Sequence, residues 1–297
     1  MSMPNLPFPI RSHGGLLSPK QLAQVIGASE SSLKRWIDSG QIDASRTSGG
    51  HRRIALAEAL RFIRVTGHPI IDPGPLGLNP LAADLGKPLV DRLHQALSTA
   101  DAIQARSLMV SAYAGGMALA ELCDGPIRQA MERIGLLWHE SESGIMVEHQ
   151  ATDTCLQALH ALRAYLREPE PGAPIALGGA PSRDPYLLPS LMSAIILGDI
   201  GYRTVNLGPE TPLETLRHAI EQHQPRLVWL AVSTADAAAN LRQPLHKLSD
   251  DLLTRRISLA VGGRHAADIG LEPRSNLLRS RSLSEVAAFA RGLLNAR

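Results

Sequence analysis

The side chains whose chemistry is easiest to interpret are cations near the amino terminus. Lys34 and Arg35 lie in a segment with helical periodicity, and more cations follow a Ser48-Gly49-Gly50 turn. Ammonium and guanidinium groups bind phosphate oxygens and the edges of bases. The pattern predicts contact with double-stranded DNA, with Lys34 and Arg35 at base edges and Arg46, Arg52 and Arg53 on phosphates. The candidate DNA-binding residues are Lys34, Arg35, Arg46, His51, Arg52 and Arg53.

The charge distribution agrees with a basic head on a mildly acidic body. Between Arg11 and Arg64 lie nine Lys or Arg and four Asp or Glu residues, which gives this segment a net charge of +5. Because the whole chain carries +2, the remainder carries −3. This asymmetry is typical of a protein in which only the head meets phosphates, although a basic face is often just solvated surface.

The elements that would position these cations can be predicted from caps and periodicity. Ser18-Pro19 is a good helix start, and the apolar positions up to Ile26 share one face. A Gly27-Ala-Ser29 turn leads to a second helix with Leu33, Trp36 and Ile37 inward and Lys34 and Arg35 outward. A hairpin with its tip at residues 48–50 and a helix over 55–66 complete the pattern. These elements predict a helix-turn-helix with a basic wing over residues 15–66.

The remaining chain divides at two breaks rich in proline and glycine. We expect a disordered N-terminus at 1–14, a linker at 67–80, a four-helix bundle at 81–168 and an α/β domain at 173–297. Alternating strands and helices predict a doubly wound, flavodoxin-like parallel sheet, with ligands at the carboxyl ends of its strands. The predicted helices of the bundle are 89–98, 102–113, 117–138 with a break at Gly125-Pro126, and 145–167. The predicted strands are 175–178, 204–207, 227–233, 258–261 and 277–279.

The motifs of this chain resemble those of one family of regulators. The Gly50-His51-Arg52-Arg53-Ile54 run and the helix after it resemble the winged heads of MerR-type regulators. Trp138, followed after nine residues by Glu148-His149, resembles the helical cap over cobalamin in light-sensing, cobalamin-dependent members. The resemblance implies adenosylcobalamin as cofactor. The cofactor-binding residues that it implies are Trp138, His139, Glu148, His149, Asp184, Tyr186, Ser233, Gly262 and Gly263.

The chain departs from that family at the residue that would bind cobalt. Family members carry a histidine, the lower axial ligand, two residues after an acid that follows the first strand. Here that acid is Asp184, the histidine is replaced by Tyr186, and a glycine three residues further on is replaced by Pro189. A neutral phenol is a poor cobalt ligand compared with imidazole. Three interpretations stay open: cobalamin bound without a protein lower ligand, another planar or nucleotide-like ligand, or a ligand-free interaction module.

The sequence gives weaker indications of other function classes. No apolar run spans a bilayer and the N-terminus lacks a signal-peptide pattern, so we expect a cytoplasmic protein that does not contact membranes. Cys123 and Cys155 fit no metal spacing and are expected to be buried thiols. Ser233, His265 and Asp268 do not by type alone make a catalytic triad, so we expect no enzyme and no metal site. The expected function is a repressor that binds operator DNA as a homodimer or homotetramer. The alternatives are a corrinoid-carrying enzyme subunit and a scaffold without DNA affinity.

Overall fold

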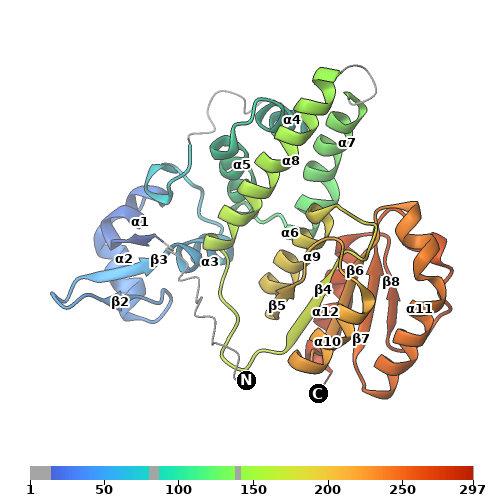
Figure 1. Cartoon of the computed structure of the whole chain (residues 1–297). Coiled ribbons are helices and arrows are strands. Elements are labelled where there is room, and N and C mark those ends of the chain that lie inside the picture. The colour runs from blue at the N-terminus through green and yellow to red at the C-terminus, as the bar shows by residue number, and fades with distance from the viewer. Residues whose placement is uncertain (1–14, 80–86, 138–141, 297) are drawn as a thin grey trace, which may run out of the picture. The chain divides into compact units, whose positions relative to one another are not determined.

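The computed structural model describes residues 15–79, 87–137 and 142–296. The chain divides into two compact units, one made of residues 1–80 and 160–167 and the other of residues 81–159 and 168–297. The first unit has short helices and a small sheet, and the second has a helical part and a larger parallel sheet (Figure 1). Within the described residues, no helix is both long enough and apolar enough to cross a lipid bilayer.

The first unit is a helical head with an antiparallel sheet in the order β1-β3-β2. Ser18 begins α1 as predicted, since its hydroxyl accepts from the Gln21 amide and the Gln21 side chain accepts from the Ser18 amide. Gly27 ends that helix in the left-handed conformation, with φ 68°. The elements are β1 (Leu16–Leu17), α1 (Pro19–Ile26), α2 (Glu30–Asp38), β2 (Ser45–Arg46), β3 (Arg52–Ala55), α3 (Leu56–Thr66) and the 3-10 turn η1 (Gly74–Leu76).

The segment after α3 forms part of this head, although its composition predicted a linker over 67–80. The Ile71 amide donates to the Val25 carbonyl at 2.7 Å, and the Gln24 side chain donates to Asp72 at 2.6 Å. Leu76 is buried, and its carbonyl accepts from the Tyr165 hydroxyl at 2.8 Å. Prolines and glycines prevent a regular helix here, but they do not prevent packing. Residues 163–165, predicted as the end of a bundle helix, form the 3-10 turn η4 (Arg163–Tyr165) in the same unit.

The helical part of the second unit follows the predicted pattern, with one local change. Its helices are α4 (Leu89–Ser98), α5 (Ala102–Ala114), α6 (Leu119–Leu122), α7 (Arg128–Leu137) and α8 (Glu142–Leu162), the last of which ends in the first unit. The break predicted at Gly125-Pro126 is a π-helical turn, η3 (Cys123–Ile127). Proline has no N–H to donate, and a wider turn is one way for a helix to continue past it.

The two cysteines are free and buried in this helical part, as predicted. Cys123 lies in the π turn and Cys155 on α8. Burial raises the pKa of the Cys155 thiol to about 12, and burial together with the nearby Cys155 raises the pKa of Cys123 even further. Both thiols are therefore protonated at neutral pH and unreactive as nucleophiles.

A five-stranded parallel sheet forms the rest of the second unit, in the order β5-β4-β6-β7-β8. This is the strand order of the predicted flavodoxin-like sheet. Its strands are β4 (Ile175–Gly179), β5 (Arg203–Asn206), β6 (Leu227–Ala231), β7 (Ser258–Gly262) and β8 (Leu277–Arg279). The connections are α9 (Leu187–Ile200), α10 (Leu213–His223), α11 (Ala235–Thr254), the 3-10 turn η5 (Ala266–Ile269) and the last helix α12 (Leu283–Asn295).

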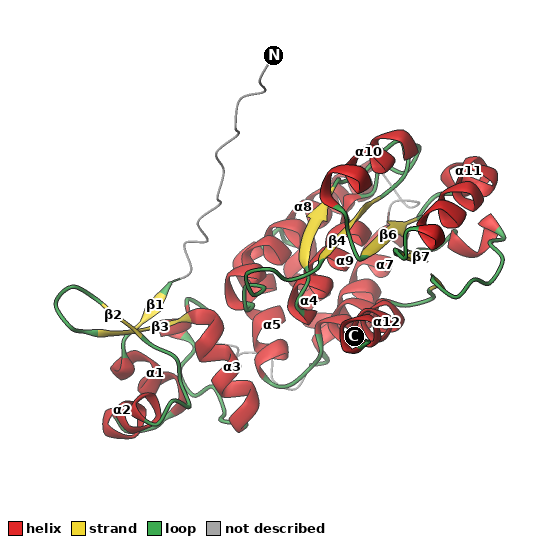
Figure 2. Ribbon diagram, turned by 90° about the horizontal axis from the view of Figure 1, so that it is seen from below, coloured by secondary structure: helices red, strands yellow, loops and turns green. Residues whose placement is uncertain are grey.

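Both faces of this sheet are covered, as expected for a doubly wound fold. One face packs against residues of α10 and α11, such as Leu216 and Leu245. The other face packs against α9 and α12 through Tyr202 and Trp229. The views in Figures 1 and 2 show the helices arranged around these strands.

The side chains of Asp124 and Tyr113 make polar contacts between the helical part of this unit and the α/β part. The Asp124 carboxylate accepts from the amides of Leu283 and Ser284, at 2.8 and 2.9 Å, and so caps α12 from outside that helix. The Tyr113 hydroxyl donates to Asp199 at 2.7 Å. A carboxylate at a helix N-terminus is stabilised by the free amides and by the helix dipole. Asp124 therefore connects the π turn to α12.

Candidate nucleic-acid interface and candidate ligand edge

The second helix of the head, α2, presents two exposed cations side by side. Ser29 caps this helix by accepting from the Ser32 amide at 3.1 Å. Leu33 is buried, which turns its neighbours Lys34 and Arg35 to solvent, as predicted. Lys34 forms an ion pair with Glu30 at 2.8 Å, one turn earlier, and this contact lowers the pKa of Glu30. Lys34 thus has an acidic neighbour that a phosphate or base edge would have to replace.

The hairpin of β2 and β3 carries the second basic group. Its tip is closed by a hydrogen bond from the Gly50 amide to the Thr47 carbonyl at 2.8 Å, and Gly50 has φ 78°. Such a conformation favours glycine. Arg46 and His51 are exposed on the two sides of this tip. The predicted hairpin is therefore present, and its tip is polar and solvent-facing.

The structure separates the two arginines that the sequence places together on β3. Side chains alternate along a strand, and Ile54 is buried, so Arg52 lies on the inner side and Arg53 on the other. Arg52 contacts α2: its Nη2 donates to Asp38 at 2.5 Å and its Nη1 to the Lys34 carbonyl at 3.2 Å. Arg46 is the cross-strand partner of Arg52. Both arginines of β3 were predicted to hold phosphates; the structure places them on opposite faces of the strand, and Arg52 already has protein acceptors.

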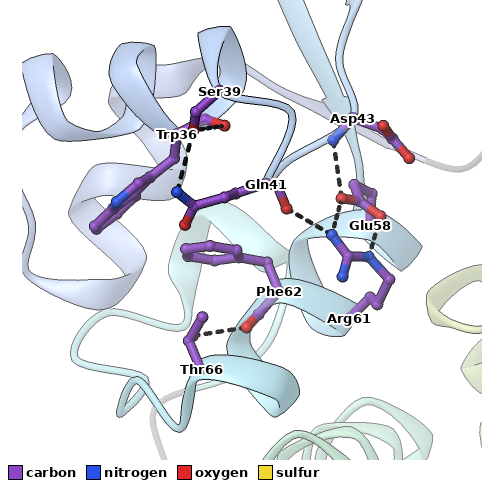
Figure 3. Close-up of polar contacts among 8 residues, drawn as sticks. All are labelled: Trp36, Ser39, Gln41, Asp43, Glu58, Arg61, Phe62 and Thr66. Carbon is purple, nitrogen blue, oxygen red and sulfur yellow. Dashed lines mark hydrogen bonds and ion pairs between the residues drawn. The ribbon is translucent and has the colours of Figure 1, made fainter.

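A second polar network, which no sequence motif indicated, holds the base of the hairpin (Figure 3). Arg61 on α3 donates to Glu58 through Nε at 2.6 Å and Nη2 at 2.5 Å, and also to the Gln41 carbonyl at 2.7 Å. Glu58 in turn accepts from the Asp43 amide at 2.9 Å. The contact with Glu58 raises the pKa of Arg61. The i, i+3 spacing of Glu58 and Arg61 is the sequence signal that could have indicated this pair.

A cluster of three aromatic rings lies beside this network. The Trp36 ring lies 5.2 Å from Phe62, and His68 lies 5.6 Å from Trp36 and 5.8 Å from Phe62, between ring centroids. Trp36 belongs to α2, Phe62 to α3 and His68 to the segment predicted as a linker. These contacts hold α2 against α3 through the buried side of α2, and so fix the orientation of its exposed face.

The carboxyl edge of the parallel sheet gathers the predicted residues of the α/β domain. Asp184 follows β4 and is fully buried, and it accepts hydrogen bonds from the amides of Ser233, after β6, and of Tyr186. Burial raises the pKa of Asp184, and the backbone donors partly offset this rise. The carboxyl group therefore ties two loops of the edge together. Asn206, which no motif pointed to, also lies at this edge and accepts from Ser190 at 2.6 Å and from the Gly208 amide at 3.1 Å.

The residue at the place of the axial histidine does not fit cobalt ligation by imidazole. Tyr186 stands at the place of the axial histidine, and this residue is 53% exposed. Packing of the protein itself requires glycine at 263, because a Cβ there would lie 2.3 Å from the Val232 carbonyl oxygen. At Gly262 a Cβ would make only ordinary van der Waals contact with Ser280, at 3.5 Å. The Ser233 hydroxyl is buried without a hydrogen-bond partner. The edge thus has one unsatisfied polar atom among its described residues, and Tyr186 supplies no imidazole at the place of the axial histidine.

The predicted cap residues are only partly described. Trp138 and His139 lie outside the described residues. Glu148 and His149 lie on α8, where Glu148 accepts from Thr152 at 3.0 Å and the His149 side chain is 75% exposed. The described part of the chain contains no cluster of three His, Cys, Asp or Glu residues suited to a metal ion.

Comparison with known proteins identifies two domains in this chain. Residues 16–64 match the model of a helix-turn-helix domain, and residues 89–163 match the model of a B12 binding domain. The chain thus contains a helix-turn-helix domain and a B12-binding domain of the helical kind. None of the curated proteins matches this chain.

Three solved structures of corrinoid or cobalamin proteins match this chain, and one of them supports its fold. The monomethylamine corrinoid protein of Methanosarcina barkeri is 16% identical, with a TM-score of 0.52 over 69% of this chain and 98% of that chain. A cobalamin-binding protein from Desulfitobacterium hafniense DCB-2 is 16% identical, with a TM-score of 0.34 over the same shares. The methanol:cobalamin methyltransferase complex MtaBC of Methanosarcina barkeri is 15% identical, with a TM-score of 0.35 over 78% of this chain and 88% of that chain. The first likeness supports the mixed α/β fold with its parallel five-stranded sheet.

Proposed function

We propose that this protein is a transcriptional regulator of the MerR type, a repressor whose winged head binds operator DNA. The observation that carries the proposal is the exposed pair Lys34 and Arg35 on the second helix of a helix-turn-helix domain, next to a basic hairpin. A second helix of this kind enters the major groove, where cations contact base edges. Arg46 and His51 at the exposed hairpin tip are suited to the sugar-phosphate backbone.

Selection of bound duplexes from a random-sequence library tests the DNA proposal. The wild-type chain is expected to enrich a defined sequence, and the Lys34→Ala/Arg35→Ala variant is expected to lose that preference. The matched control is Lys247→Ala, which removes an exposed cation on α11, far along the chain from the head. If the wild-type chain enriches no sequence, or if the head variant selects as well as wild type, the proposal is wrong.

A symmetric oligomer is part of this proposal. One head of this size contacts only a short stretch of duplex, whereas paired heads match palindromic half-sites. We expect the chain to bind its selected site as a homodimer or homotetramer. Light scattering of the complex measures the stoichiometry, and a single chain on each site would contradict this part.

The B12-binding domain favours a second activity, the binding of a cobalamin-type ligand that sets oligomeric state or DNA affinity. Since Tyr186 supplies no imidazole, such a ligand would be held without a protein ligand to cobalt from this loop. The test is the visible spectrum of the protein after incubation with adenosylcobalamin in the dark and desalting. Retained corrin bands support the sensor, and their absence leaves a regulator with another ligand or none.

The Tyr186→His/Pro189→Gly variant restores the residue types of the resembling family and serves as a positive control. Stronger corrin retention by this variant than by wild type would show that the two replacements weakened binding. An unchanged spectrum would show that the departure at residues 186 and 189 does not explain the affinity.

We also propose that the chain acts by binding and not by catalysis. His265 bonds to Asp268 at 2.7 Å, but the buried Ser233 hydroxyl has no hydrogen-bond partner. A serine nucleophile requires an adjacent base to accept its proton. Hydrolysis of simple ester substrates is the assay, and turnover that disappears in Ser233→Ala would contradict this proposal.

A further inference from the structure

The outer half of the hairpin, beyond the residues of β3 that pair with β1, has little to hold it in place except its polar contacts. β2 contains two residues and pairs with β3 at only two positions, Ser45 with Arg53 and Arg46 with Arg52. A two-stranded hairpin is marginally stable on its own in water. Its tip, residues 47–50, is exposed, and the buried side chain of β3 is Ile54, near the base. The outer half therefore depends on the contacts that its side chains make with other elements.

Arg52 makes such a contact, and its geometry differs from that of a free surface cation. Its side chain is only 19% exposed, and its guanidinium spans two acceptors on α2, the Asp38 carboxylate and the Lys34 carbonyl. Asp38 is the last residue of α2, where the helix dipole favours a positive charge, and Lys34 lies one turn before it. A planar guanidinium is suited to such bridging because its N–H groups point in fixed directions.

Arg46 provides the contrast on the facing strand. It is the cross-strand partner of Arg52 and is exposed, and its side chain makes a long hydrogen bond of 3.4 Å to the Gly50 carbonyl within the hairpin. No ion pair of Arg46 occurs among residues 15–79 as the structure describes them. Two arginines on facing positions therefore differ in their partners: one is bound to α2 and one is available to a ligand.

We infer that Arg52 is a positioning residue that fastens the hairpin to α2 through Asp38, so that helix and hairpin meet DNA as one rigid body. This inference rests on the proposed DNA-binding function and assigns a different role to Arg52 within it. Removal of Arg52 would loosen the angle between the two DNA-contacting elements, while the number of phosphates neutralised would stay the same. Removal of Arg46 would lower that number by one.

The salt dependence of binding separates these two roles. The slope of log affinity against log salt changes by about 0.9 for each phosphate that the protein no longer neutralises. With the duplex that wild type selects, Arg52→Ala is expected to weaken binding about fivefold with an unchanged slope. Arg46→Ala is the matched control, and its slope is expected to become shallower by about 0.9. A shallower slope in Arg52→Ala would refute the inference, because it would place that cation on a phosphate.

A double-mutant cycle with Asp38 tests the partner. Asp38→Ala is expected to weaken binding about as much as Arg52→Ala, although it removes a negative charge from a DNA-binding surface. The double variant is expected to bind no worse than either single variant, because both substitutions remove the same ion pair. Tighter binding by Asp38→Ala would show that the acid merely competes with DNA for Arg52, and would overturn the inference.

A charge-preserving variant and hydrogen exchange control for a general loss of folding in the head. Asp38→Asn/Arg52→Gln preserves the net charge of the pair and can keep a hydrogen bond between the two side chains. This variant is expected to recover part of the affinity that Arg52→Ala loses, at the wild-type salt slope. Hydrogen exchange over residues 45–53 is expected to speed up in Arg52→Ala and to stay near wild type in Arg46→Ala. If wild type binds no DNA at all, the proposed function fails; if wild type binds but both exchange profiles are equal, only the inference fails.

Discussion

Removal of the Arg61 side chain offers the sharpest test of how the head is held together. Arg61 donates two hydrogen bonds to Glu58 and one to the Gln41 carbonyl, all between 2.5 and 2.7 Å. The Glu58 side chain is only 11% exposed, so Arg61→Ala leaves a nearly buried carboxylate without its cation. The Asp43 amide, at 2.9 Å, would still donate to that carboxylate.

The expected cost follows from these contacts. Hydrogen bonds to charged groups contribute about 1.5–3 kcal/mol each in net terms. Arg61 is one-third exposed, so water replaces part of the interaction and the side chain regains rotamer freedom. We expect Arg61→Ala to lower the free energy of unfolding of the head by about 2 kcal/mol. For a unit of this size that corresponds to a decrease in Tm of roughly 10 °C.

Urea unfolding of the full chain, with hydrogen exchange of peptides from residues 36–66 as the probe, measures this cost for the head alone. Arg35→Ala is the control, because it removes an exposed arginine of α2. In a cycle with Glu58→Ala, the double variant is expected to cost about as much as one single variant. A decrease below about 0.5 kcal/mol for Arg61→Ala, or strictly additive decreases, would refute the reasoning.

Three further predictions concern the second unit. Gly178→Ala is expected to destabilise the sheet by more than about 3 kcal/mol, because a Cβ there would lie 2.1 Å from the Trp229 carbonyl oxygen. Gly198→Ala is the control: there is open space around this glycine, so the substitution should be neutral or stabilising. Thermal melts followed by circular dichroism compare the two variants. Asp124→Ala is expected to cost about 1–2 kcal/mol in urea unfolding, because α12 loses its external cap, and an unchanged midpoint would count against that contact. Burial raises the pKa of Asp184, so the folded state binds this proton more tightly than the unfolded state does, and its contribution to stability falls as pH rises through the folded pKa. The free energy of unfolding of wild type, minus that of Asp184→Asn, should therefore decrease from mildly acidic to neutral pH. An increase in this quantity would contradict the raised pKa.

Local signals were sufficient for most of the elements. The helix start at Ser18, the turn at Gly27 and the strand–helix alternation after residue 173 are each encoded within a few residues, and the structure has these elements where they were predicted. The linker at 67–80 was predicted from proline and glycine content alone. Composition shows that a segment cannot form a helix, but it does not show whether the segment packs, and Leu76 does so.

The candidate site was predictable in its residue types and less so in its partners. Lys34 and Arg35 are turned outward because Leu33 faces inward, a matter of helical period. Asp184 was identified through a resemblance to cofactor-binding proteins, whereas in the structure its carboxylate accepts backbone hydrogen bonds across two loops. Those donors lie 2 and 49 residues away along the chain, and the distant one has no local signature.

The amino-acid order alone determined the basic head, the helical middle and the parallel sheet, because caps, turns and periodicity act over a few neighbours. Only the folded chain decided what each cation faces. Alternation along β3 turns Arg52 toward Asp38 and Arg53 away from it, and the packing of α3 brings Arg61 beneath the hairpin. A side chain's charge is a property of its sequence position, but whether that charge is available to DNA depends on the acceptors that tertiary packing places beside it.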